Sequence, residues 1–104
     1  MVLLESKYTL DKDKLAEYTK CAKEEMVPYW LSVPGMKELR AYREQGSYTV
    51  LVEMDFDSFE SWGKAADNPK TKEIMSKLAL YTHDYELKLW DISPLVPQPL
   101  KPKK

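Results

Sequence analysis

The segment from Ser47 to Phe56, SYTVLVEMDF, constrains the fold of this 104-residue chain more than any other stretch. Its side chains alternate between an apolar row and a mixed row. Alternation with a period of two predicts a β-strand that packs one face against a core. The apolar row is Tyr48, Val50, Val52, Met54 and Phe56, and the mixed row is Thr49, Leu51, Glu53 and Asp55.

Three more strands are predicted, over residues 2–10, 36–44 and 85–92. The turn at Val33-Pro34-Gly35 leads into the second of these. Gln45 and Gly46 make a connection of hairpin length, so residues 36–44 and 47–56 are expected to pair antiparallel.

Two helices lie between the strands. The first starts after an Asp11 cap, and Pro28 is expected to kink it or end it near Val27. Asp57 or Ser58 caps the second, which is broken at Asn68-Pro69 and continues to about Tyr81. The second helix is expected to carry Phe59, Trp62 and Ala66 inward, and His83 with Asp84 is expected to form its exit.

The element order βαββαβ predicts an α+β, ferredoxin-like fold: a four-stranded antiparallel sheet with helices on one face and the second helix broken near Pro69. The helix-facing rows are expected to include Leu39, Val50, Val52, Met54, Leu87 and Leu89. A face that is partly apolar and partly charged indicates one half of an interface. The opposite face would carry Leu3, Glu5, Lys7, Arg40, Tyr42, Leu51, Glu53, Lys88 and Trp90.

Length and composition limit the number of domains and the kinds of partner that this chain can have. Residues 1–92 are predicted to form one domain and residues 93–104 a proline-rich C-terminal tail. A net charge of −1 gives no field that would attract nucleic acid, and no stretch approaches the roughly 18 apolar residues of a membrane helix. The single cysteine, Cys21, excludes a disulfide framework and a cysteine-built metal site. We expect a cytoplasmic protein with no nucleic-acid or membrane partner.

With its βαββαβ order, its Pro34-Gly35 turn and the passage from EMDFDSFESW to Asn68-Pro69, the chain resembles the dimeric α/β-barrel superfamily over roughly residues 2–92. Within that superfamily it is similar to the antibiotic-biosynthesis-monooxygenase-like proteins. The resemblance implies a homodimer whose two sheets pack face to face into a barrel. It also implies a cavity in each subunit, between sheet and helices or at the barrel mouth.

The resemblance implies several activities, including cofactor-independent oxygenation of polyphenols, haem degradation and sugar mutarotation. Trp62 matches a tryptophan of the haem-degrading members, but residues 2–10 contain no asparagine and His83 lies too far along the helix. The arrangement of the mutarotases is not reproduced either. We therefore expect neither a cofactor nor a metal.

The only histidine, His83, is the side chain best suited to proton transfer near neutral pH, and it is the candidate catalytic base. The alternative is a surface histidine at a helix end. Candidate substrate-binding residues are Tyr29, Trp30, Arg40, Trp62 and Tyr81. The aromatic residues, together with Phe59, also fit a simple core, and Arg40 with Glu53 also fits a structural ion network.

Two functions remain open at this point. One is a cofactor-independent monooxygenase that acts on a phenolic or quinol substrate. The other is a non-catalytic homodimer that binds a small aromatic ligand or serves a structural role.

Overall fold

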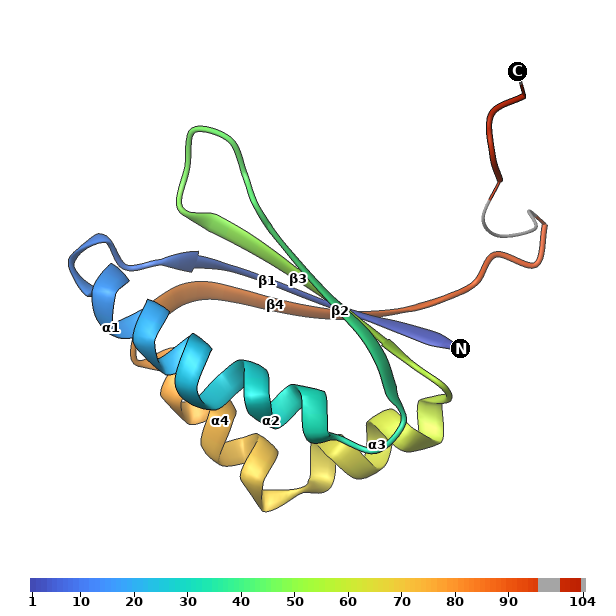
Figure 1. Cartoon of the computed structure of the whole chain (residues 1–104), viewed down its shortest axis with the longest axis horizontal. Helices are drawn as coiled ribbons and strands as arrows, with labels where there is room; N and C mark the ends of the chain where they lie inside the picture. Colours follow the sequence, from blue (N-terminus) through green and yellow to red (C-terminus); the bar gives the residue numbers. More distant parts are fainter. Residues whose placement is uncertain (96–99, 104) are drawn as a thin grey trace.

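The computed structural model describes residues 1–95 and 100–103. Its order is β1 (Val2–Leu10), a 3₁₀ turn (Lys12–Lys14), α1 (Leu15–Cys21), a π-helical turn (Ala22–Met26), α2 (Val27–Ser32), β2 (Met36–Arg43), β3 (Thr49–Phe56), α3 (Phe59–Asp67), α4 (Pro69–Ala79) and β4 (Thr82–Asp91). The fold is the predicted ferredoxin-like α+β fold. Figure 1 shows the sheet as one layer and all the helices as a second layer on one of its faces.

The sheet is antiparallel throughout, with the strand order β2-β3-β1-β4. Its helix-facing rows bury Leu4 on β1 and Val50, Met54 and Phe56 on β3, as the alternation predicts. Burial of such side chains, each worth about 1.5–3 kcal/mol, is the main force that holds the two layers together. Ile74 and Leu78 of α4 complete this core from the helix side.

Of the two outcomes predicted at Pro28, a kink or an end near Val27, the end is wrong. The helical segment continues past the proline as α2 to Ser32. A π-helical turn ends at Met26, two residues before this proline. Such a wider turn changes the hydrogen-bond spacing at the point where proline offers no N–H. The extra helix brings Trp30 into the core.

One detail of the second helical segment differs from the prediction. Of the two predicted caps, Ser58 is the one that caps α3, by accepting a hydrogen bond from the Ser61 N–H. Phe59 does not face inward, since the residue is 64 % exposed at the first position of the helix. Phe56, at the end of β3, is fully buried and packs edge-to-face on Trp62. Asn68 then caps α4, so the break before Pro69 is as predicted.

The last strand starts earlier than expected. His83 and Asp84 lie within β4, which begins at Thr82. The β1–β4 register shifts between Lys7 and Thr9, and Asp84 takes a positive φ of 54° there. Leu87 and Leu89 lie opposite Ser6 and Leu4, on the helix side, but they remain partly exposed because β4 is an edge strand.

Beyond β4 the described residues 92–95 and 100–103 contain no helix or strand. Figure 1 shows this part of the chain leading away from the sheet. The predicted tail of residues 93–104 lies in part outside the described residues. None of the described helices is long and apolar enough to cross a membrane.

Candidate functional site

Between the sheet and the helices lies an apolar cleft that contains two adjoining cavities, of about 100 and 250 Å³. We call these the inner cavity and the β4-side cavity. Ser6, Trp30, Met54 and Met75 border both of them. The inner cavity is also lined by Tyr8, Tyr18, Ala22, Met26, Val27, Leu39, Ala41, Val52, Ile74 and Leu78, and the β4-side cavity by Leu4, Trp62, Ala66, Thr71, Lys72, Tyr85 and Leu87.

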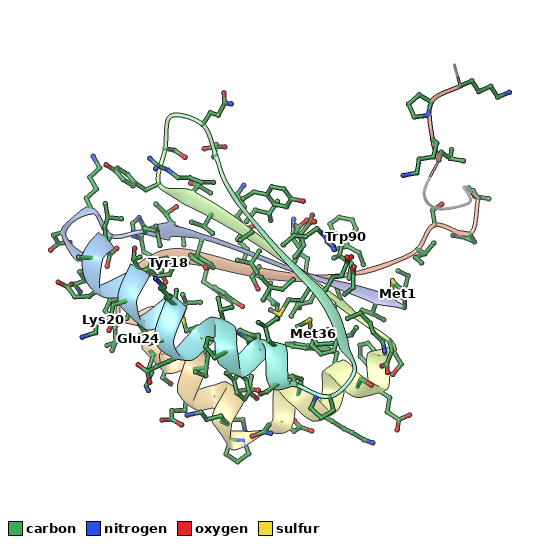
Figure 2. The ribbon with its side chains drawn as sticks, viewed as in Figure 1. Met1, Tyr18, Lys20, Glu24, Met36 and Trp90 are labelled. Atoms are coloured by element: carbon green, nitrogen blue, oxygen red, sulfur yellow. The ribbon has the colours of Figure 1, made fainter. Side chains whose placement is uncertain are left out.

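Three tyrosines from different elements meet in this cleft. The hydroxyl groups of Tyr8 on β1 and Tyr18 on α1 are 2.8 Å apart and hydrogen-bonded. The ring of Tyr85 on β4 stacks on Tyr8 with centroids 6.3 Å apart, and its hydroxyl is 3.3 Å from Ser6 Oγ. Figure 2 shows Tyr18 between α1 and the sheet. We call Ser6, Tyr8, Tyr18 and Tyr85 the hydroxyl cluster.

Burial controls the acidity of these phenols. Desolvation raises the pKa of Tyr8 far above its usual value, and the neighbouring Tyr18 raises it further. Desolvation is also the largest cause that raises the pKa of Tyr18 and of Tyr85. Since a free tyrosine already titrates near pH 10, all three phenols are neutral at physiological pH. They can donate hydrogen bonds, and they cannot serve as bases there.

The chemistry available to the cleft follows from its lining. No carboxylate or imidazole of the described residues lines either cavity, and Lys72 is the only charged residue among the described ones in the two linings. Among the described residues no group of three or more histidine, cysteine, aspartate or glutamate side chains could hold a metal ion. The site is therefore suited to an apolar ring with an oxygen that accepts hydrogen bonds.

Of the predicted site residues, the cleft brings together the two tryptophans. Trp30 borders both cavities and Trp62 borders the β4-side cavity. Tyr29 stacks edge-to-face on Trp30, and its hydroxyl is hydrogen-bonded to Thr71, but it lines a separate groove beside Gly35. Tyr81 is partly buried against the core and lines neither cavity.

His83 lies outside the cleft. Its side chain is 53 % exposed, and Nδ1 is 2.6 Å from a carboxylate oxygen of Asp11. This contact explains why Asp11, although it stands at the helix start, makes no capping hydrogen bond with its side chain. The pair borders a surface groove between the start of the first helix and the β2–β3 hairpin. The catalytic role of His83 stays a prediction.

Arg40 lies on the opposite face of the sheet. Its guanidinium donates two hydrogen bonds to Asp55, at 2.9 and 3.1 Å, and one to Glu53 at 3.1 Å. A further bond reaches Glu38. These contacts, those to Asp55 first, raise the pKa of Arg40, which is charged at every accessible pH. The geometry is that of an ion network.

Sequence reasoning missed the hydroxyl cluster. The signal was present in β1, because Ser6 and Tyr8 interrupt an otherwise apolar row between Leu4 and Leu10. A row of that kind indicates hydroxyl groups inside a core. Their partners Tyr18 and Tyr85 come from a helix and from the last strand, 10 and 77 residues further along the chain than Tyr8, so spacing alone does not connect them.

Comparison with known proteins finds likenesses in structure only. Neither a protein-family model nor a curated protein matches the sequence. An antibiotic biosynthesis monooxygenase of known structure has a TM-score of 0.78 at 9 % identity, covering 90 % of this chain and 100 % of its own. SnoaB, a cofactor-independent oxygenase from Streptomyces nogalater, has a TM-score of 0.77 at 12 % identity, covering 93 % of this chain and 97 % of its own.

A third structure carries a different family name. It is an ethyl tert-butyl ether d family protein from Bacillus halodurans, with a TM-score of 0.70 at 15 % identity, and the match covers 89 % of this chain and 100 % of that protein. Identities this low show a shared fold. The fold is that of the antibiotic-biosynthesis-monooxygenase-like proteins.

Proposed function

We propose that this chain, which has the fold of the antibiotic-biosynthesis-monooxygenase-like proteins, binds a flat phenolic or quinol molecule in its cleft and oxygenates it without a cofactor. The observation that carries the proposal is the hydroxyl cluster, a group of neutral hydrogen-bond donors inside an apolar cleft. SnoaB, a protein of the same fold, is a cofactor-independent oxygenase. A shared fold does not establish a shared function, so the proposal rests on the chemistry of the cleft.

The walls of the cleft suit an aromatic ring. Trp30 and Trp62 supply rigid aromatic surface, and Phe56 holds the Trp62 ring from behind with centroids 5.6 Å apart. Met54 and Met75 stand where the two cavities adjoin. Methionine side chains repack easily, so their movement would join the cavities around one ligand.

The proposed reaction needs no electron donor besides the substrate. A phenol with a free para carbon reacts with dioxygen to give a para-quinone and water. The new carbon–oxygen bond takes one oxygen atom, while the phenolic proton and the displaced ring proton leave in the water. The substrate supplies the electrons that reduce dioxygen.

The role of the tyrosines is to stabilise the reactive anion. A phenolate transfers electrons to dioxygen more readily than a phenol, and hydrogen bonds to the charged form lower the pKa of a bound phenol. Tyr8, Tyr18 and Tyr85 stay protonated and can give such bonds. Because no carboxylate or imidazole from residues 1–95 or 100–103 lines either cavity, the substrate proton passes to water.

We also propose that the protein is a homodimer, formed through the sheet face opposite the helices. Figure 2 shows Trp90 on that side of the sheet, and its side chain is 48 % exposed. Tyr42 is similarly exposed there, around the Arg40 network. Exposed aromatic residues around paired charges are typical of an interface.

The single cysteine favours a reducing compartment, and we propose that the protein is cytoplasmic.

The test combines binding and oxygen uptake. Calorimetric titration with hydroxynaphthalenes and anthrones should show binding, and an oxygen electrode should show turnover of at least one of them. Tyr8→Phe and Tyr85→Phe should each lower the rate by about 10-fold, the effect of losing one donor of a charge-stabilising site. Tyr48→Phe is the matched control, because it removes a phenolic hydroxyl that lies outside both cavities.

Two other outcomes would contradict the proposal. Binding without oxygen uptake would contradict the oxygenase and leave a ligand-binding protein. A loss of turnover in His83→Ala, with the tyrosine variants unaffected, would place the chemistry in the surface groove and refute the role of the cleft.

A further inference from the structure

Among the described residues, Lys72 is the only charged one that lines the cleft. It belongs to the β4-side cavity, whose other described lining residues are apolar or aromatic or carry a hydroxyl group. No described residue that lines the inner cavity is charged. Of the charges on the described part of the chain, a ligand in the cleft therefore meets one, which is positive.

This charge is not used within the protein. The neighbouring Lys70 pairs with Glu73 at 3.2 Å, and Lys77 is bound by Glu25 and Glu73. Lys72, between them on α4, takes part in no ion pair among the described residues. The charge of a lysine that pairs with a neighbouring carboxylate is offset by that carboxylate, whereas the charge of Lys72 is available to a ligand.

The place of Lys72 adds to its positive potential. It lies in the first turn of α4, which begins at Pro69 and has 11 residues. The dipole of a helix favours negative charge near its first turn. Lys72 is also exposed and lines the β4-side cavity. An exposed lysine keeps its ammonium group in water while its carbon chain packs on apolar surface.

From these observations we infer that the ligand of the cleft is an anionic phenol, a flat ring system with a carboxylate or similar group that meets Lys72. This inference rests on the proposed function and names the class of molecule that the site selects. The phenolic oxygen would meet the hydroxyl cluster at Tyr85 and Ser6, and the ring would lie against Trp62 and Leu87.

Each end of such a ligand is stable in a different part of the site. An anion that is buried in an apolar cavity is costly, whereas an anion at a wet mouth beside a lysine is not. A phenolic oxygen inside the cavity needs donors, which the tyrosines provide. The two ends of the site therefore recognise opposite ends of one molecule and fix its orientation.

The experiment compares two probes that differ in one group, 2-naphthol and 6-hydroxy-2-naphthoate, by calorimetric titration of the full chain. The wild type should bind the carboxylate more tightly by about fivefold, the range expected for one exposed charge pair. Lys72→Met should remove this preference, and Lys72→Arg should retain it. Lys70→Met is the matched control, because it removes a lysine of the same helical turn that lines neither cavity.

Salt gives a second readout. The preference for the carboxylate should shrink as the NaCl concentration rises from 0.02 to 0.5 M, because the interaction is exposed and screened, while the affinity for 2-naphthol should change little. Equal binding of both probes by the wild type, or an unchanged preference in Lys72→Met, would overturn the inference and leave the proposed function intact. Binding of neither probe would overturn both.

Discussion

The hydroxyl groups of Tyr8 and Tyr18 are 2.8 Å apart, and this contact joins the sheet to the first helix across an otherwise apolar cleft. The two rings also meet edge-to-face, with centroids 6.2 Å apart. The pair therefore links the two layers beside the inner cavity, which both residues line. The same phenols are the donors that the proposed reaction requires.

This contact can be measured by a double-mutant cycle. Tyr8→Phe and Tyr18→Phe should each lower the free energy of unfolding by about 1 kcal/mol, the net worth of a partly buried hydrogen bond. The double variant should lose less than the sum of the single losses, by roughly 0.5–1 kcal/mol, because both changes remove the same bond. Urea denaturation followed by circular dichroism gives these values. Strict additivity would contradict the contact.

The buried phenols also predict a loss of stability in alkali. Their pKa values are raised in the folded protein, so above about pH 10 the unfolded chain releases protons that the folded chain keeps. Their contribution to stability is complete below about pH 10 and declines as the pH rises further. Urea midpoints between pH 8 and 11.5 should show the decline, and it should be shallower in Tyr8→Phe. Parallel curves for the two proteins would refute the raised pKa of Tyr8.

Two glycines with positive φ offer a matched pair of substitutions. At Gly35, with φ of 87°, an added Cβ would lie 2.6 Å from the Ser61 side chain. At Gly46, with φ of 80°, nothing lies within 4 Å of such an atom. Gly46→Ala should cost about 1–2 kcal/mol from the backbone alone. Gly35→Ala should cost roughly 1–3 kcal/mol more, because Ser61 has to move. Equal melting temperatures for both variants would contradict the close approach at Gly35.

The Arg40 network predicts how the proposed dimer responds to substitution. Arg40→Met leaves Glu53 and Asp55 without their cation on the sheet face. If a second copy covers that face, the unpaired carboxylates become buried, and association should weaken by at least about 10-fold. Sedimentation equilibrium over a range of concentrations measures this.

Arg43→Met is the matched control for the dimer. It also removes an arginine of β2, but the side chain of Arg43 lies on the other face of the sheet from Arg40, because the two residues are three positions apart. Its guanidinium lies over the Tyr48 ring, 5.1 Å from the centroid. This variant should associate like the wild type. A wild-type protein that is monomeric at micromolar concentrations would refute the proposed interface.

The order of elements and the direction of each face were readable from the sequence, because they depend on short-range periodicity. Alternation in residues 47–56 gave the buried row of Val50 and Met54, and the Asn68-Pro69 pair gave the break between α3 and α4. Phe59 was placed wrongly for the same reason. Helical spacing assigns a side of the helix, whereas tertiary packing decides whether a residue is buried: Phe56 packs on Trp62, and Phe59 is exposed.

By itself, then, the sequence determined the ferredoxin-like fold, the helix-facing rows and the presence of aromatic residues near the core. Only the tertiary structure decided which of them share a site. Tyr8, Tyr18 and Tyr85 meet through contacts between β1, α1 and β4, while His83 and Arg40 lie outside the cleft. The physical reason is that local patterns report which side of an element faces apolar surroundings. Proximity between distant residues, and the desolvation that keeps those phenols neutral, arise only when the layers pack.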